Sequence, residues 1–155
     1  MLSVDRVSFK AMSARRIALL IATGVVLIFI FVQSLLPQSV SAEESGWFTE
    51  KILNPIASLF GLGPLSHAAV RKLAHIFEYT VLAALLILTL RGQIIKSVGL
   101  GFTFAFLDES LQKLTGRGSQ LSDVWIDLIG VALGTAFGVL VWKLAHRTPR
   151  KARGE

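Results

Sequence analysis

The sequence contains no cysteine among its 155 residues, and it has few residues of the kinds that cover a soluble protein. The missing cysteine excludes disulfide bonds, thiolate metal sites and cysteine nucleophiles. Only 17% of the residues are charged, whereas 53% are hydrophobic. Because this balance leaves too little charge to cover the core of a soluble domain, the composition indicates an integral membrane protein.

Four apolar runs, 17–36, 66–90, 94–114 and 122–145, are long enough to cross a bilayer, which takes about 20 helical residues. The first run exceeds the apolar part of a cleaved signal peptide, so we interpret it as a retained membrane anchor. Short connections predict that the last three helices are antiparallel neighbours. We therefore predict an all-α integral membrane fold, a four-transmembrane-helix bundle. It forms a single domain over 1–155, with its core at about 17–145 and a basic tail at 146–155.

A shorter segment, 47–60, lies between the first two runs and follows a polar stretch at 38–46. Its residues Phe48, Ile52, Ile56 and Phe60 recur at three- and four-residue spacing and form an apolar stripe. The segment is too short to cross a membrane and begins with Trp47, so we predict a short interfacial helix. The Gly-Leu-Gly-Pro sequence at 61–64 predicts a loop.

The net charge of +6 comes from cations at the two ends and in short turns, not along one helix face. This distribution indicates membrane topology rather than nucleic-acid binding. With the N-terminus in the cytoplasm, eleven of the sixteen Lys and Arg residues lie on the cytoplasmic side. The bias predicts that both termini are cytoplasmic, and it places the polar residues of the last three helices at one depth, near the outer surface.

Three predicted helices contribute polar side chains to this outer layer, and ionisable groups inside a membrane are costly unless they are paired or functional. On the second helix Arg71, His75, Glu78 and Tyr79 share one face. The catalytic candidates are His75, Glu78, Asp108 and Glu109. The binding candidates are Arg71, Lys72, Tyr79, Gln112, Arg117, Asp123 and Asp127.

The same residues also have a structural interpretation, in which hydrogen bonds and ion pairs hold the helices together. Because Arg71, Lys72, Lys113 and Arg117 lie at the same depth, we favour a salt-bridged network over a metal site. One histidine with loosely spaced carboxylates, His75 with Glu78, Asp108 and Glu109, is a weak metal signal. We therefore assign no metal ligand and no cofactor.

Glycine recurs every four residues along the last predicted helix, at Gly130, Gly134 and Gly138. Small residues at this spacing allow a neighbouring helix backbone to approach closely. The pattern predicts close packing, either within the fold or between copies in a homo-oligomer.

Three blocks of sequence resemble the VanZ-like family: RKLAHIFEY at 71–79, DESLQ at 108–112, and RGSQLSD at 117–123 followed by Gly130. The serine-rich stretch 36–45 is also similar, so the resemblance covers roughly 17–142. Asp127 departs from the family, which usually carries Asn there, and this leaves open whether position 127 binds anything or only caps and packs. The resemblance implies a multi-pass protein of the bacterial inner or plasma membrane. It also implies a link to glycopeptide susceptibility, because the founding member is associated with teicoplanin resistance.

The leading hypothesis is a membrane protein that binds or acts on a cell-envelope component, a lipid or lipid-linked molecule, at the outer leaflet. In this hypothesis Arg71 and Lys72 attract an anionic headgroup. One alternative is a membrane-embedded hydrolase or transferase acting on a lipid-linked substrate, with His75 as general base or ligand and Asp108 or Glu109 as its partner. A structural or regulatory partner of another membrane protein is the other alternative. The sequence leaves open whether the protein is an enzyme.

Overall fold

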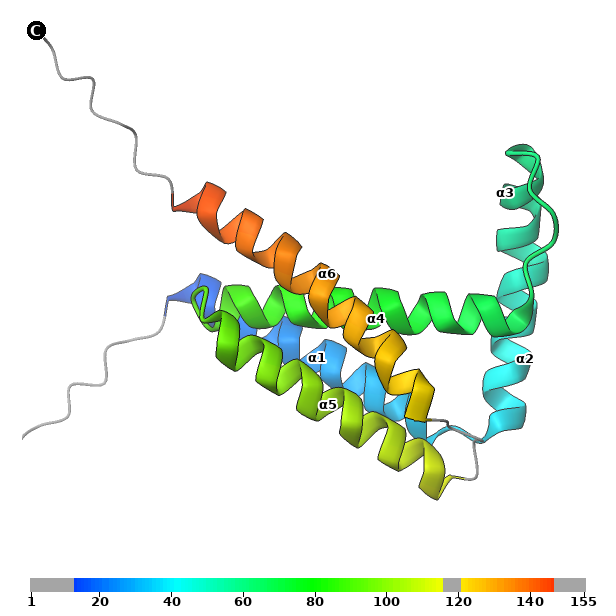
Figure 1. The fold of residues 1–155 in the computed structure, drawn as a ribbon, viewed down its shortest axis with the longest axis horizontal. Coiled ribbons are helices and arrows are strands. Elements are labelled where there is room, and N and C mark those ends of the chain that lie inside the picture. Colours follow the sequence, from blue (N-terminus) through cyan, green and yellow to red (C-terminus); the bar gives the residue numbers. More distant parts are fainter. Residues whose placement is uncertain (1–12, 116–120, 147–155) are drawn as a thin grey trace, which may run out of the picture.

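The structure, a computed structural model, describes residues 13–115 and 121–146, and all secondary structure in these ranges is helical (Figure 1). Four long helices run alongside one another: α1 (Ala14–Leu35), α4 (His67–Thr89), α5 (Ile94–Leu114) and α6 (Leu121–Ala145). Between α1 and α4, α2 (Gln38–Phe48), the π-helical turn η1 (Thr49–Leu53) and α3 (Asn54–Leu59) stand across one end of this bundle. The start of α1, the end of α6 and the turn between α4 and α5 lie at the opposite end. The predicted all-α fold is confirmed.

Local sequence signals set the ends of the long helices. The Ser13 hydroxyl caps α1 by accepting a hydrogen bond from the Arg16 N–H at 3.4 Å, and Ser66 caps α4 through the Ala69 N–H at 3.2 Å. Beyond the end of α4, Gly92 has a φ of 78° and its N–H donates to the Ile87 carbonyl at 2.8 Å. The predicted limits of the four long helices agree with these ends to within one turn.

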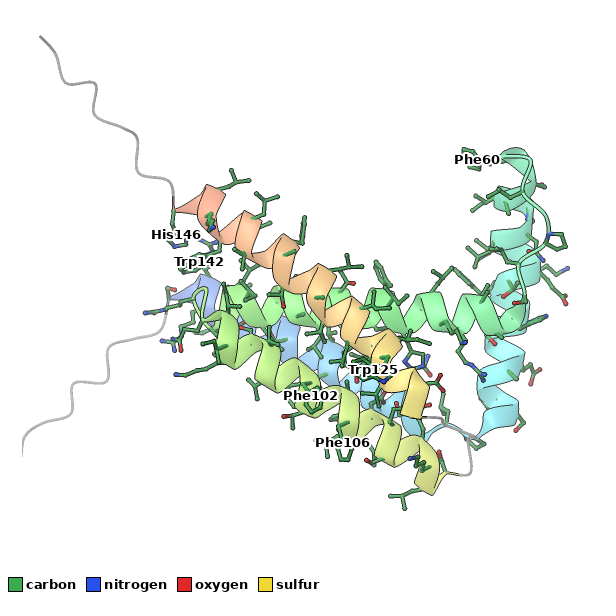
Figure 2. The ribbon with its side chains drawn as sticks, viewed as in Figure 1. Phe60, Phe102, Phe106, Trp125, Trp142 and His146 are labelled. Atoms are coloured by element: carbon green, nitrogen blue, oxygen red, sulfur yellow. The ribbon has the colours of Figure 1, made fainter. Side chains whose placement is uncertain are left out.

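Three of the long helices, α1, α4 and α6, are long and apolar enough to cross a membrane by length and composition. α5 is not among them, because its 21 residues include Lys96, Asp108, Glu109 and Lys113. The prediction of four transmembrane helices is therefore corrected to three candidate spans. The two carboxylates of α5 are nevertheless only 0% and 3% exposed, while the aromatic side chains of Phe102 and Phe106 point outward (Figure 2).

The connection between α1 and α4 also differs from the prediction. Residues 38–46, expected to be a polar stretch, already form most of α2, which begins directly after Pro37. The helical path then passes through η1 and continues into α3, where Pro55 occupies the first turn. The predicted helix at 47–60 is therefore the second half of a longer helical segment, and its location at a membrane interface stays a prediction.

Glycines of α6 make the contact between α4 and α6 unusually close. A Cβ atom built on Gly134 would lie 2.1 Å from the Thr80 carbonyl oxygen, and one on Gly130 would lie 2.6 Å from the Ile76 carbonyl oxygen. Gly138 meets the same helix at Ala84 and Ile87. The glycine spacing thus serves packing within the fold, and the homo-oligomer stays a prediction.

Candidate functional site

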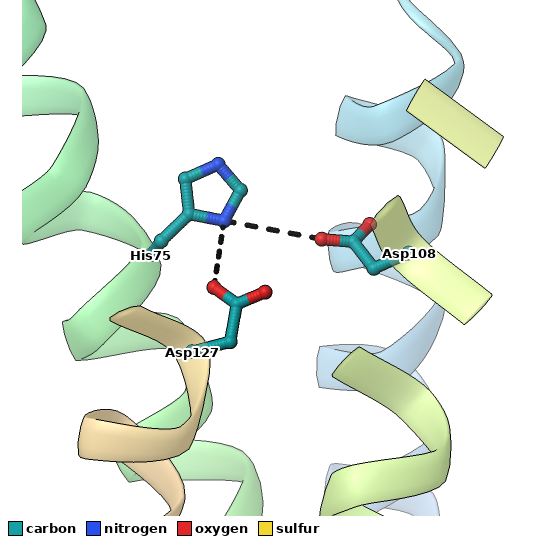
Figure 3. A group of neighbouring side chains, drawn as sticks. All are labelled: His75, Asp108 and Asp127. Carbon is teal, nitrogen blue, oxygen red and sulfur yellow. Dashed lines mark ion pairs between the residues drawn. The ribbon is translucent and has the colours of Figure 1, made fainter. Parts of the chain in front are cut away.

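α4, α5 and α6 bring the side chains of His75, Asp108 and Asp127 into one cluster (Figure 3). The Nδ1 atom of His75 lies 3.2 Å from Oδ1 of Asp127 and 3.9 Å from Oδ2 of Asp108. The side chains of Asp108 and Asp127 are 0% and 1% exposed, whereas that of His75 is 20% exposed. The shorter distance is that of an ion pair between the imidazole and the Asp127 carboxylate. His75 therefore lies between two buried carboxylates.

The helix arrangement explains why residues so far apart in the sequence meet. His75 lies in the first half of α4, Asp108 near the end of α5 and Asp127 near the start of α6, and all three positions are at the α2 end of the bundle. Gly130 follows Asp127 by less than one turn, and a Cβ there would lie 2.8 Å from the Cβ of Tyr79. The missing side chain at Gly130 lets α6 approach α4 closely enough to place Asp127 beside His75.

Two side chains hold the carboxylate of Asp108 in position. The Ser34 hydroxyl of α1 donates to Oδ1 of Asp108, and the Gln112 amide donates to Oδ2 at 3.1 Å. Ser34 is 2% exposed and belongs to α1. With its hydroxyl, the cluster receives side chains from all four long helices. Ser34 was not among the site residues predicted from the sequence. The signal in the sequence was a pair of polar residues, Gln33 and Ser34, near the end of a mainly apolar first span.

The other predicted site residues are distributed around this cluster. Tyr79, four residues after His75, is fully buried, and its hydroxyl has no hydrogen-bond partner among the described residues. Glu109 is also buried, and Asp123 is half-buried one turn before Asp127. Lys72 is exposed, and Arg117 lies outside the described residues. In the described part of the chain, both ion pairs of Asp108 and Asp127 are with His75 rather than with lysine or arginine.

A cavity of about 910 Å³ lies beside the cluster, between α1, the α2–η1 segment and α4. Its wall is mainly apolar and aromatic, and it includes Phe29, Trp47, Leu73 and Phe77. Polar side chains also line it: Gln33, Ser34, Glu43, Ser45, Arg71, His75 and Glu78. Trp47 and Phe77 are 61% and 69% exposed, so the cavity is open to its surroundings. An apolar wall with a few polar groups is typical of a site for a small amphiphilic ligand.

Comparison with known proteins places most of the chain in one family. A family model described as VanZ/LLP1 matches residues 15–144. The uncharacterized membrane protein YwnJ of Bacillus subtilis (strain 168) is 38% identical over 66 residues, which are 43% of this chain and 46% of YwnJ. The chain thus spans less than half the length of this curated relative. No solved structure matches.

Proposed function

Because the chain belongs to the VanZ/LLP1 family of membrane proteins, we propose that it binds a lipid-linked component of the cell envelope in the cavity between α1, α2 and α4. The lining of the cavity supports this proposal. The cavity joins an aromatic and aliphatic wall to the charged side chains of Arg71 and Glu78, and it reaches His75 at the edge of the buried cluster. A ligand that matches both parts has a hydrocarbon chain and a polar headgroup.

Arg71 points to the chemistry of the headgroup. A guanidinium group donates paired hydrogen bonds to phosphate oxygens, and it does so with better geometry than a lysine ammonium. Arg71 is half-buried in the cavity wall, whereas its neighbour Lys72 is exposed and does not line the cavity. A phosphate-linked lipid would place its chain against residues such as Trp47 and Phe77, with its phosphate at Arg71.

We place the cavity at the outer leaflet, with both termini in the cytoplasm. The distribution of lysine and arginine supports this orientation. It requires α5 to cross the membrane as well, despite its charges. Asp108 and Glu109 of α5 are buried inside the protein, where such charges are tolerated. A protein that binds an envelope precursor at the outer surface would alter the response to antibiotics that act there, so we expect a change in teicoplanin susceptibility when the protein is removed.

Native mass spectrometry of the protein in nanodiscs tests the binding proposal, with a polyprenyl phosphate as the probe. We expect a bound polyprenyl phosphate in the wild type and at least about tenfold weaker binding after Arg71→Gln, because a hydrogen bond to a charged group contributes about 1.5–3 kcal/mol. Lys72→Gln, next to it but outside the cavity, is the matched control. Ala74→Trp would fill the cavity, whereas Ala68→Trp, on the exposed face of α4, would not. Equal binding by all four variants would contradict the proposal.

A membrane-embedded hydrolase or transferase is a second candidate function, favoured by the contact between His75 and Asp127. His75 lines the cavity and its imidazole contacts a carboxylate. This arrangement suits a histidine that acts as a general base. The sequence hypothesis paired His75 with Asp108 or Glu109, but Asp127 is nearer than Asp108. The expected result for an enzyme is hydrolysis of a bound polyprenyl diphosphate by wild-type protein, in which water attacks phosphorus, a P–O bond breaks, and polyprenyl phosphate and inorganic phosphate form. Asp127→Asn should lose this hydrolysis while it still binds the lipid. Binding of the lipid without hydrolysis in the wild type is the result expected for a binding protein.

A further inference from the structure

The cluster of His75, Asp108 and Asp127 has an excess of buried negative charge. Two carboxylates face one imidazole, so the three groups carry a net negative charge even when the histidine is protonated. In the described residues no lysine or arginine forms an ion pair with either aspartate. Burying an unbalanced charge costs several kcal/mol or more, so the cluster requires a further cation or a bound proton.

The atoms of the cluster are spaced as metal ligands are. One ligand atom from each residue, the imidazole nitrogen and two carboxylate oxygens, lies within 4.8 Å of both others. Ligands about 2.1 Å from a tetrahedral zinc ion are roughly 3.4 Å apart. The distances from His75 Nδ1, 3.2 Å to Asp127 and 3.9 Å to Asp108, fall on either side of that spacing.

Buried polar atoms without hydrogen bonds are a second, independent sign of a ligand. Oδ2 of Asp127 has no hydrogen-bond partner in the described part of the protein, and Oδ1 has only its ion pair with His75, although the residue is 1% exposed. Such groups are rare in folded proteins unless an ion or water satisfies them. The bonds from Ser34 and Gln112 to Asp108 also resemble the outer partners that orient a metal-binding carboxylate.

We propose that His75, Asp108 and Asp127 bind a divalent transition-metal ion, Zn²⁺ or Mn²⁺. Imidazole favours such ions over Mg²⁺ and Ca²⁺, which prefer oxygen ligands alone. The proposal goes beyond lipid binding and does not rest on it. His75 and Ser34 also line the cavity, so the ion would be within reach of a phosphate headgroup there. The weak sequence signal grouped His75 with Glu78, Asp108 and Glu109; the structure replaces the two glutamates with Asp127.

The test measures metal binding to purified full-length protein that carries no polyhistidine tag and has been stripped with a chelator. Equilibrium dialysis against Zn²⁺ or Mn²⁺, followed by elemental analysis, gives the ions bound per chain. We expect one ion per chain, held at least about tenfold more weakly after His75→Gln or Asp127→Asn. His67→Gln, an exposed histidine of the same helix, is the matched control and should keep the ion.

Folding of each variant is checked by helical circular dichroism and gel filtration. Gln112→Ala provides a second variant, because it removes the hydrogen bond to Asp108 and leaves all three proposed ligands in place. It should weaken binding by about tenfold in a folded protein. Zn²⁺ should also raise the melting temperature of the wild type and leave that of Asp127→Asn unchanged. Absence of binding to the wild type, or equal loss in His67→Gln and His75→Gln, would overturn the proposal.

Discussion

Replacing Gly134 with alanine should destabilise the fold by forcing α4 and α6 apart. The new Cβ atom would lie 2.1 Å from the Thr80 carbonyl oxygen, whereas ordinary contact begins at 3.4 Å. Since the obstructing atom belongs to the backbone, the helices must separate by roughly 1 Å, and a gap of this size forfeits a quarter to a half of the dispersion energy across it. Overpacking of this kind costs about 1–3 kcal/mol.

Reversible unfolding in mixed detergent micelles measures this cost. Gly99→Ala is the matched control, because it makes the same change inside a helix where a Cβ meets nothing within 4 Å. We expect the free energy of unfolding of Gly134→Ala to be lower than that of Gly99→Ala by about 1–3 kcal/mol. Equal stability of the two variants would refute the close α4–α6 contact, and with it the account of how Asp127 comes to lie beside His75.

Three further changes test separate parts of the structure. Ser34→Ala removes the hydroxyl bonded to buried Asp108 and should cost about 1–2 kcal/mol in unfolding free energy; Ser110→Ala, whose hydroxyl bonds only to the Phe106 carbonyl, should have little effect. Gly92→Ala should destabilise more than Gly61→Ala, because both positions have positive φ but only the first would also place a Cβ 2.7 Å from Trp142. Cysteines at Leu62 and Gln93, both exposed, should differ in labelling by an impermeant thiol reagent; only position 62 should react from outside, and the reverse pattern would contradict the proposed orientation.

The long helices were predictable because their signals are local. Apolar runs of membrane-spanning length mark α1, α4 and α6, and the limits predicted for α5 are those observed. α2 was not predicted, because its sequence is polar. Its helix begins directly after Pro37. Of the four predicted spans, composition supports three. The run that forms α5 is as long as a span, but its charges remove it from the candidates by composition.

The candidate site was predicted in part. Polar residues of three helices were predicted to lie at one depth, and the structure brings His75, Asp108 and Asp127 of these helices together. The rotation of each helix, and the close approach of α6 to α4 at Gly130, decide which carboxylates face the histidine. Neither can be predicted from residue spacing along one helix. Ser34 was missed for the same reason, since its importance comes from a partner 74 residues away.

Photo-crosslinking in membranes of cells that produce the protein tests the proposed ligand-binding cavity most directly. A photoreactive residue at Phe77 lies in the cavity wall, whereas one at Phe106 lies on the outward face of α5, and the two native side chains are 69% and 53% exposed. We predict that position 77 captures a phosphate-linked envelope lipid while position 106 captures bulk phospholipid. Capture of the same bulk phospholipid at both positions would contradict the assignment of the cavity as a specific site.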